Sequence, residues 1–246
     1  MKIAVLTSLF GSNSDLRSLT EKEIDYKSSA PHRGLGVDFY AFLDRRHEKA
    51  SGWNQVISPE FTYEQAWPYR RNAKIYKVLP DLFLPDYDVH IWIDSGHEVI
   101  KDPHLICKEN LRDNDIAVFD HPDRNCAYQE AQTVANMGIE HADLIGQQLQ
   151  HFESVGFPQN NGLYEMACYI RRKNETTRKL GLMWWEMICR FSSRDQTTFP
   201  YVLWKLKEEV SISVLPGYVN RSLLNWHENG NEFFLFGQQP NFVKKY

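Results

Sequence analysis

The sequence predicts an α/β fold, in which one Rossmann-like domain places flanking helices on a mostly parallel central sheet. Three observations lead to this class: short apolar runs typical of buried strands, helical patterns between them, and no internal repeat or Pro/Gly/Ser-rich linker. The chain has 246 residues, of which 42% are hydrophobic and 24% charged, so it can bury a sizeable core. We therefore expect residues 1–246 to form a single domain.

The strands are predicted mainly from short runs of consecutive apolar residues, which are typical of parallel strands buried on both faces. The exception is 164–171, where Met166, Cys168 and Ile170 alternate with their neighbours. In chain order, the predicted strands cover residues 3–6, 37–44, 89–94, 116–119, 164–171 and 212–215.

The helices are predicted from apolar residues that recur at helical spacing between these strands. The first covers the basic stretch 69–79, and Pro80 directly after it suits a helix end. The others cover residues 128–136, 143–153, 179–190 and 196–206. Strands that alternate with helices along the whole chain favour a mostly parallel sheet.

Charge, cysteine content and hydropathy narrow the setting of the protein. A formal net charge of −4 argues against a surface that neutralises nucleic acid broadly. The four cysteines form no C-x-x-C pair, so we expect free thiols in a reducing compartment rather than structural zinc or disulfides. The apolar run at the N-terminus is too short for a signal peptide, and no run approaches the roughly 20 residues of a membrane helix. These features predict a cytoplasmic protein without a membrane span.

Several common catalytic motifs are missing from the sequence. The first predicted strand is not followed by G-x-G-x-x-G, and G-x-x-x-x-G-K-[ST] does not occur, so dehydrogenase and P-loop functions lose their main support. The nucleophile elbow G-x-S-x-G and the zinc motif H-E-x-x-H are absent as well.

Polar side chains end several predicted strands, namely Thr7, Asp44, Asp94 and Asp120. Carboxyl ends of parallel strands share one edge of a sheet, so these groups are expected to converge on one crevice. Aspartates at strand ends also cap turns and helices, and for Asp44 and Asp120 the two interpretations carry similar weight. Asp94 follows four apolar residues with no helix that obviously needs a cap, which favours a ligand role.

A basic segment and a polar helix start supply further candidates. Arg70, Arg71, Lys74 and Lys77 have spacings that put three of them on one helix face, either as a solvated basic face or as a clamp for a diphosphate. Arg194-Asp195-Gln196 offers a cation, a carboxylate and an amide at a helix start, where anions are favoured, although a capping role is the simpler interpretation.

The stretch 77–103 reads K-V-L-P-D-L-F-L-P-D-Y-D-V-H-I-W-I-D-S-G-H-E-V-I-K-D-P. It resembles the core of a glycosyltransferase-like family, long catalogued as a domain of unknown function, with bacterial members and plant members linked to seed mucilage. Further blocks follow in order: H-P-D-R-N-C-A-Y-Q-E-A at 121–131, N-G-L-Y-E at 161–165, R-R-K-N at 171–174, W-W-E, and R-D-Q-T-T-F-P-Y-V-L-W-K at 194–205. With V-D-F-Y-A-F-L-D at 37–44, the resemblance spans nearly the whole chain, and its collinear blocks make it specific.

The resemblance implies a GT-A type fold that binds a nucleotide-diphosphate sugar. In such enzymes the loop after the first strand and the end of the second strand hold base and ribose, here Thr7, Phe10 and Asp44. Arg71, Lys74, Lys77, Asp94, Arg124 and Asn161 complete the expected nucleotide-sugar-binding set.

The D-x-D motif that binds a divalent metal in such enzymes is incomplete here, because the matching residues are Asp94-Ser95-Gly96. Either Asp94 holds Mn²⁺ or Mg²⁺ together with His227, or Arg71, Lys74 and Lys77 supply the positive charge instead. A lone loop histidine such as His227 is otherwise usually a surface residue.

The implied reaction is displacement at the anomeric carbon of a hexosyl or pentosyl donor by a hydroxyl of a carbohydrate or glycoconjugate acceptor, in polysaccharide or glycoconjugate synthesis. We expect Asp195 to be the carboxylate at the reacting centre, with Arg194 and Gln196 positioning sugar or phosphate and Glu165 as the second choice of base. Two alternatives stay open: a non-catalytic sugar- or nucleotide-binding relic of the fold, and a glycosyltransferase acting on DNA bases.

Overall fold

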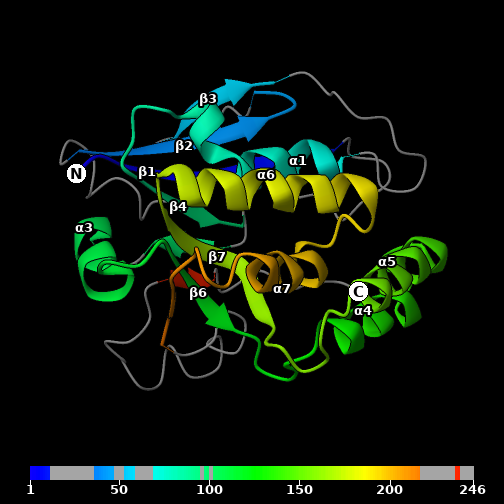
Figure 1. The fold of residues 1–246 in the computed structure, drawn as a ribbon. Helices are drawn as coiled ribbons and strands as arrows, with labels where there is room; N and C mark the ends of the chain where they lie inside the picture. The colour runs from blue at the N-terminus through cyan, green and yellow to red at the C-terminus, as the bar shows by residue number, and fades with distance from the viewer. Residues whose placement is uncertain are drawn as a thin grey trace, which may run out of the picture.

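The computed structural model describes residues 1–11, 36–46, 53–58, 69–94, 97–99, 102–216 and 236–238. Its centre is a seven-stranded sheet in the order β3-β2-β1-β4-β7-β6-β8, next to a two-stranded sheet of β5 and β9 (Figure 1). The strands are β1 (Ile3–Leu9), β2 (Val37–Leu43), β3 (Asn54–Ile57), β4 (Val89–Ile93), β5 (His97–Val99), β6 (Ile116–Asp120), β7 (Tyr164–Arg172), β8 (Ile212–Val214) and β9 (Phe236–Gln238). The predicted α/β class with a mostly parallel sheet is confirmed.

Only β7 breaks the parallel arrangement of the large sheet. It pairs antiparallel with both β4 and β6, whereas the remaining neighbours pair parallel. The register between β6 and β7 shifts after Val118, which faces Tyr169, to Phe119, which faces Glu165. The carboxyl ends of β1, β2, β4 and β6 consequently lie at one edge of the sheet, as predicted.

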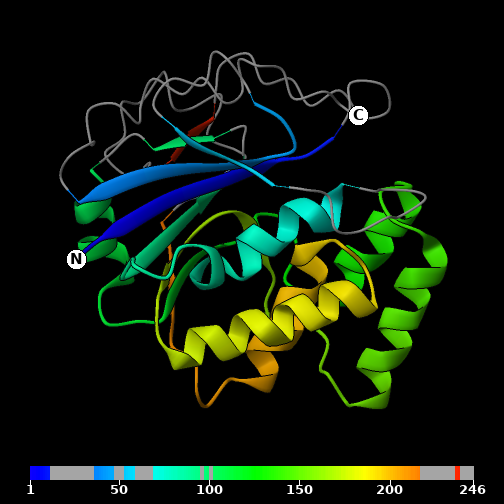
Figure 2. The same ribbon diagram turned by 90° about the horizontal axis from the view of Figure 1, so that it is seen from above.

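The helices are α1 (Arg70–Val78), α2 (Pro80–Phe83), α3 (Pro103–Ile106), the π-helical turn η3 (Cys107–Leu111), α4 (Ala127–Asn136), α5 (Ala142–Ser154), α6 (Glu175–Arg190) and α7 (Asp195–Lys205). Figure 2 shows α1, α6 and α7 together on one face of the sheet. Their buried side chains, Trp184 and Phe199 among them, pack against Leu6, Trp92 and Tyr169 of the strands. Burial of these large apolar surfaces is the main force that holds the helical layer on the sheet.

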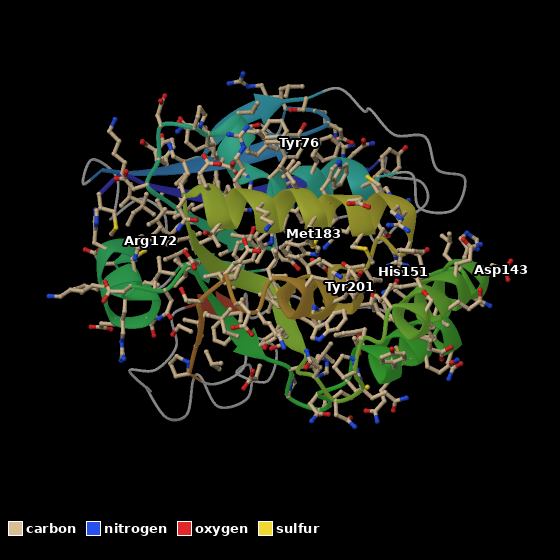
Figure 3. All side chains as sticks on the ribbon, in the orientation of Figure 1. Tyr76, Asp143, His151, Arg172, Met183 and Tyr201 are labelled. Atoms are coloured by element: carbon tan, nitrogen blue, oxygen red, sulfur yellow. The ribbon has the colours of Figure 1, made fainter. Side chains whose placement is uncertain are left out.

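The other face of the sheet and the outer helices complete the core. Ile106 and Leu111 of α3 and η3 are buried with the strand residues of the second face. The α4–α5 pair packs against α7, where His151 Nε2 and Tyr201 Oη lie 3.2 Å apart; both residues are labelled in Figure 3. Among the described residues, no helix is long and apolar enough to cross a lipid bilayer.

Several element boundaries differ from the prediction for local reasons. The first strand continues to Leu9 because residues 7–9 stay in register with β2, so Thr7 lies inside the strand and not at its end. Helix α6 begins four residues before the predicted start, because Asn174 and Thr177 form a reciprocal capping box there. The short elements β3, β5, β9, α2, α3 and η3 were not predicted.

Arg171 locks β7 to the helical layer from inside the core. Its side chain is buried, and its Nη1 donates to the Val78 carbonyl at 2.6 Å, while Nη2 donates to Asp81 Oδ1 at 3.1 Å and to the Thr177 carbonyl. Gly181 of α6 lies against the same Val78 carbonyl. This close approach leaves no room for a larger residue at position 181.

Candidate functional site

The candidate site is a cluster of Lys74, Lys77, Asp94 and Asp195, called here the Lys–Asp cluster, where α1, the end of β4 and the start of α7 meet. Lys74 Nζ lies 2.7 Å from Asp195 Oδ2. Lys77 Nζ contacts the same oxygen and lies 3.4 Å from Asp94 Oδ1. Only 1% of the Lys77 side chain and 5% of the Asp195 side chain are exposed, against 44% for Asp94. The cluster is thus a buried ionic network that opens to solvent at Asp94.

Local sequence explains why the charged groups of this cluster meet. Lys74 and Lys77 are three residues apart on α1, so they share one face of the helix. Asp94 directly follows the last residue of β4, and its backbone N–H donates to the Ala167 carbonyl of β7 at 2.7 Å. Asp195 is the first residue of α7, where the helix dipole favours a carboxylate.

The electrostatics of the cluster favour full ionisation of Asp195. Burial alone would raise the pKa of the Asp195 carboxyl, but the ammonium groups of Lys74 and Lys77 hold it well below its usual range. Burial likewise opposes the charge on Lys77, yet Asp195 and Asp94 outweigh it and raise the pKa of Lys77. For Lys74, burial dominates over the attraction of Asp195 and lowers the pKa to about 8. Asp195 is therefore a permanent anion, and Lys74 is the cation that gives up its proton most easily.

Trp92 and the backbone around it hold Asp94 and Lys77 in place. Trp92 Nε1 donates to Asp94 Oδ1 at 2.8 Å, and Lys77 Nζ lies 5.3 Å from the centre of the indole ring. The Tyr169 hydroxyl donates to the Lys77 carbonyl. Trp92 and Tyr169 were not predicted as parts of the site. Both lie in buried strands, where an aromatic residue looks like an ordinary core residue and the sequence does not show which group it will contact.

The loop before α7 is positioned by Glu140, a buried carboxylate that sequence reasoning also missed. Glu140 Oε2 accepts from Ser193 N at 3.0 Å, from Ser193 Oγ at 2.9 Å and from Ser192 Oγ at 3.3 Å. Burial would raise the pKa of Glu140, but the hydrogen bonds from Ser193 lower it. This ionised anchor fixes the backbone that enters α7 and with it the position of Asp195.

Arg194 and Gln196, which flank Asp195 in the chain, bind each other. Arg194 Nη2 donates to Gln196 Oε1 at 2.8 Å, whereas Arg194 Nε is buried and has no hydrogen-bond partner. Gln196 N donates to Asp195 Oδ1 at 3.2 Å. A buried donor without a partner is costly, so Arg194 Nε is well suited to a ligand oxygen.

The four basic residues of α1 have different partners, and two of them bind backbone carbonyls. Arg71 Nε donates to the Ile188 carbonyl at 2.8 Å and Nη2 to the Phe191 carbonyl at 2.7 Å, so this guanidinium satisfies the carbonyl end of α6. Arg70 Nη1 donates to the Ile139 carbonyl at 2.6 Å. Only Lys74 and Lys77 of the four basic residues join the Lys–Asp cluster.

Of the residues predicted to hold base and ribose, Phe10 and Asp44 follow the ends of β1 and β2, whereas Thr7 lies inside β1. Asp44 Oδ2 accepts from Gly11 N at 2.9 Å and thereby joins the two strand ends. Phe10 stacks on Tyr76 of α1, with ring centroids 5.8 Å apart. The Thr7 hydroxyl is buried in β1 without a hydrogen-bond partner. Nucleotide binding by these residues stays a prediction.

The remaining predicted residues lie farther along the same edge. Arg124 is paired with the buried Glu130 of α4, with Nη2 at 2.7 Å from Oε2, and Asn161 is exposed. Glu165 is buried on β7 between Tyr164 and Met166, which both pack in the core of the helical face. Strand alternation therefore turns Glu165 toward the opposite face from Asp195.

The donors around Asp94 do not by themselves make up a divalent metal site. Asp94 Oδ1 already accepts from Trp92 and neighbours the Lys77 ammonium, a cation that competes with a metal ion. Within the described ranges, no group of three or more His, Cys, Asp or Glu residues could hold a metal. His227, the proposed second ligand, and the Ser95-Gly96 pair lie outside the described residues.

Comparison with known proteins assigns the chain to a family. The model of the TOD1/MUCI70 glycosyltransferase-like domain matches residues 37–228, which include the whole Lys–Asp cluster. A probable hexosyltransferase, MUCI70 of Arabidopsis thaliana, is 24% identical over 201 residues, which cover 72% of this chain. The match covers 34% of that relative, so the chain spans about a third of its length. The predicted resemblance is confirmed: this chain belongs to the TOD1/MUCI70 glycosyltransferase-like family.

Proposed function

We propose that this protein is a hexosyltransferase of the GT-A type, which moves a sugar from a nucleotide-diphosphate sugar to a hydroxyl of a glycan acceptor. The single observation that carries the proposal is the Lys–Asp cluster at the carboxyl edge of the sheet, inside the region that matches the family. Open α/β sheets bind ligands at that edge, which supports the same placement. The name of the plant relative supports the choice of a hexosyl group.

Charge is the main contribution of the cluster to the proposed reaction. The acceptor oxygen forms a bond to the anomeric carbon, and the bond from that carbon to the diphosphate oxygen breaks with its electron pair. The leaving diphosphate therefore gains negative charge, which preorganised cations stabilise. In our proposal Lys74 and Arg194 Nε face the diphosphate, and Asp195 keeps Lys74 and Lys77 in place.

The electrostatics also refine the predicted role of Asp195. A general base works best when its pKa lies near the working pH, and the pKa of Asp195 is held far below that range. We therefore propose that Asp195 acts as a fixed anion that orients the lysines and balances positive charge at the sugar. The proton of the acceptor hydroxyl is released to solvent water, so the step balances without protonation of Asp195.

Release of nucleoside diphosphate from UDP-glucose, UDP-galactose and GDP-mannose tests the proposal, with a mixture of plant-type oligosaccharides as acceptors. We expect turnover with one donor, and a loss of about 100-fold or more in kcat for Lys74→Met, the range for removal of a group that stabilises transition-state charge. Lys207→Met is the matched control, because 66% of the Lys207 side chain is exposed. Equal turnover of the two variants contradicts the assignment, and no turnover with any donor contradicts the function.

The need for a metal is tested by donor binding with Mn²⁺ and with a chelator. The proposal that protein cations face the diphosphate predicts that UDP raises the melting temperature in the presence of a chelator. Stabilisation that requires Mn²⁺ contradicts it and favours a metal held by Asp94 with ligands outside the described residues.

A further inference from the structure

A second cleft, of about 580 Å³, opens at the β2–β3 edge of the sheet. Strand β3 pairs with β2 only from Tyr40 onward, so the first residues of β2 have no partner in β3. The cleft lies beside this unpaired part of β2, with α2 and the turn after α2 on its other side. The lining residues that matter for the argument are Asp38, Tyr40, Phe42, Phe83, Asp86 and Tyr87. None of them belongs to the Lys–Asp cluster.

The polar wall of the cleft is a chain of hydroxyls that ends on a carboxylate. Tyr87 Oη donates to Asp38 Oδ2 at 2.7 Å and lies 2.8 Å from Tyr40 Oη. The one hydroxyl proton of Tyr87 goes to Asp38, so in the second hydrogen bond Tyr40 is the donor and Tyr87 the acceptor. The Tyr40 oxygen can then only accept a hydrogen bond from a ligand. Asp38 and Asp86 are exposed carboxylates on the same lining. The wall therefore offers acceptors to a ligand that brings several donors.

The apolar wall of the cleft is aromatic. Phe83 packs on Tyr76 with ring centroids 4.5 Å apart and on Phe42 at 5.7 Å, yet 37% of Phe83 stays exposed. An aromatic ring held from behind by two others is a rigid platform that loses little entropy on binding. Such a face suits the C–H surface of a pyranose ring, whose hydroxyls then meet the carboxylates.

A neutral polyol fits this chemistry better than a cation does. The Lys2 residue lines the cleft as well and offsets part of the charge of Asp38 and Asp86. One oxygen of Asp38 is already hydrogen-bonded to Tyr87, which reduces its pull on an ammonium group. An apolar platform beside several acceptors matches a sugar unit, with one C–H face and O–H donors around its rim.

We propose that this cleft binds one sugar unit of the glycan acceptor, away from the unit that reacts. The inference rests on the proposed glycosyl transfer, which requires a glycan acceptor. Tyr76 and Lys74 are two residues apart on α1, so they point about 200° apart around the helix axis. Tyr76 packs at the cleft, whereas Lys74 contacts Asp195, so α1 separates the two sites.

Ligand-observed NMR on the full chain tests the cleft, with cellohexaose, xylohexaose and mannohexaose as probes. We expect at least one of them to bind, and Phe83→Ala to weaken its affinity about tenfold, as expected for the loss of an aromatic platform. Leu82→Ala is the matched control, because Leu82 is the neighbour of Phe83 in α2, is 49% exposed and does not line the cleft. Asp38→Asn keeps an acceptor for Tyr87, removes the charge, and is expected to weaken binding severalfold in a fully folded protein.

Binding and turnover separate this inference from the proposed function. The cleft is overturned if none of the three probes binds, if they bind Phe83→Ala and Asp38→Asn as well as the parent, or if spermidine displaces them. Hydrolysis of the sugar donor by water does not involve the cleft, so both variants are expected to release nucleoside diphosphate at the parent rate. If a probe binds and Phe83→Ala weakens its binding, but no sugar donor is turned over, the sugar-binding cleft is supported and the proposed transferase function is contradicted.

Discussion

Replacement of Asp195 by Asn is the sharpest test of the Lys–Asp cluster. Asn has nearly the same shape as Asp but no charge, so the change leaves Lys74 and Lys77 without their shared counter-ion. Asp94 remains near Lys77, at 3.4 Å, but 44% of its side chain is exposed, which weakens its effect. The variant thus leaves uncompensated positive charge in the core.

The expected cost follows from the burial of the groups. Lys77 is 1% exposed and Asp195 5%, and breaking a buried ion pair by removal of one partner costs about 3–5 kcal/mol. Without Asp195, burial pulls the pKa of both lysines down, so the unfolded state binds more protons than the folded state near neutral pH. The variant should therefore regain stability between about pH 7 and 8, by at most about 1.4 kcal/mol per lysine. In the parent, Lys77 stays charged over this range and Lys74, whose pKa is about 8, loses its proton only in part, so the parent shows a smaller slope.

Urea unfolding at several pH values measures both effects. Asp113→Asn is the matched control, because Asp113 is exposed. The double variant Asp195→Asn/Lys77→Met should recover part of the loss, since it removes one stranded cation, and the cycle isolates the pair. The reasoning is refuted if Asp195→Asn lowers the free energy of unfolding by less than about 1 kcal/mol, which is the range of exposed ion pairs, and if its stability varies with pH in the same way as that of Asp113→Asn.

The remaining predictions concern the core. Burial lowers the pKa of His90 to about 4, so the stability present above the unfolded pKa of about 6.5 is lost as pH falls toward 4, by up to about 3 kcal/mol. In His90→Gln, the urea midpoint should therefore vary less with pH over this range. A pH dependence equal to that of the parent contradicts the proposed titration of His90. Gly181→Ala should destabilise by about 1–3 kcal/mol, because a Cβ there meets the Val78 carbonyl. Gly146→Ala, with open space around it, should stabilise α5 by about 0.5–1 kcal/mol. In thermal melts, a raised melting temperature for Gly181→Ala contradicts the first of these two predictions, and a lowered one for Gly146→Ala contradicts the second.

Much of the fold could be predicted because its signals are local. The apolar runs at 89–94 and 116–119 match β4 and β6 within a residue at each end, since strands buried on both faces are apolar throughout. The antiparallel direction of β7 could not be predicted, because direction depends on the path of the chain between strands. Short elements such as β3 and α3 have too few residues to show a period.

The sequence predicted which residues belong to the candidate site better than it predicted which of them contact each other. Lys74, Lys77, Asp94 and Asp195 all stood among the predicted residues, and the structure brings them together. Arg71 stood among them as well, and its guanidinium donates to two carbonyls at the end of α6, while its predicted role in nucleotide-sugar binding stays a prediction. Helical spacing places residues on a face, but it does not say which carbonyl or carboxylate that face will meet.

The sequence by itself determined the α/β class, the positions of the main strands and helices, and the family, because periodicity and collinear motifs are written in neighbouring residues. Only the tertiary structure decided that Asp195 is an anion between two lysines, that Glu140 anchors the loop before it, and that an aromatic cleft opens beside β2. The physical reason is that pKa values, burial and cavities arise from groups far apart in the chain, such as Lys74 and Asp195, whose separation of 121 positions leaves no local pattern.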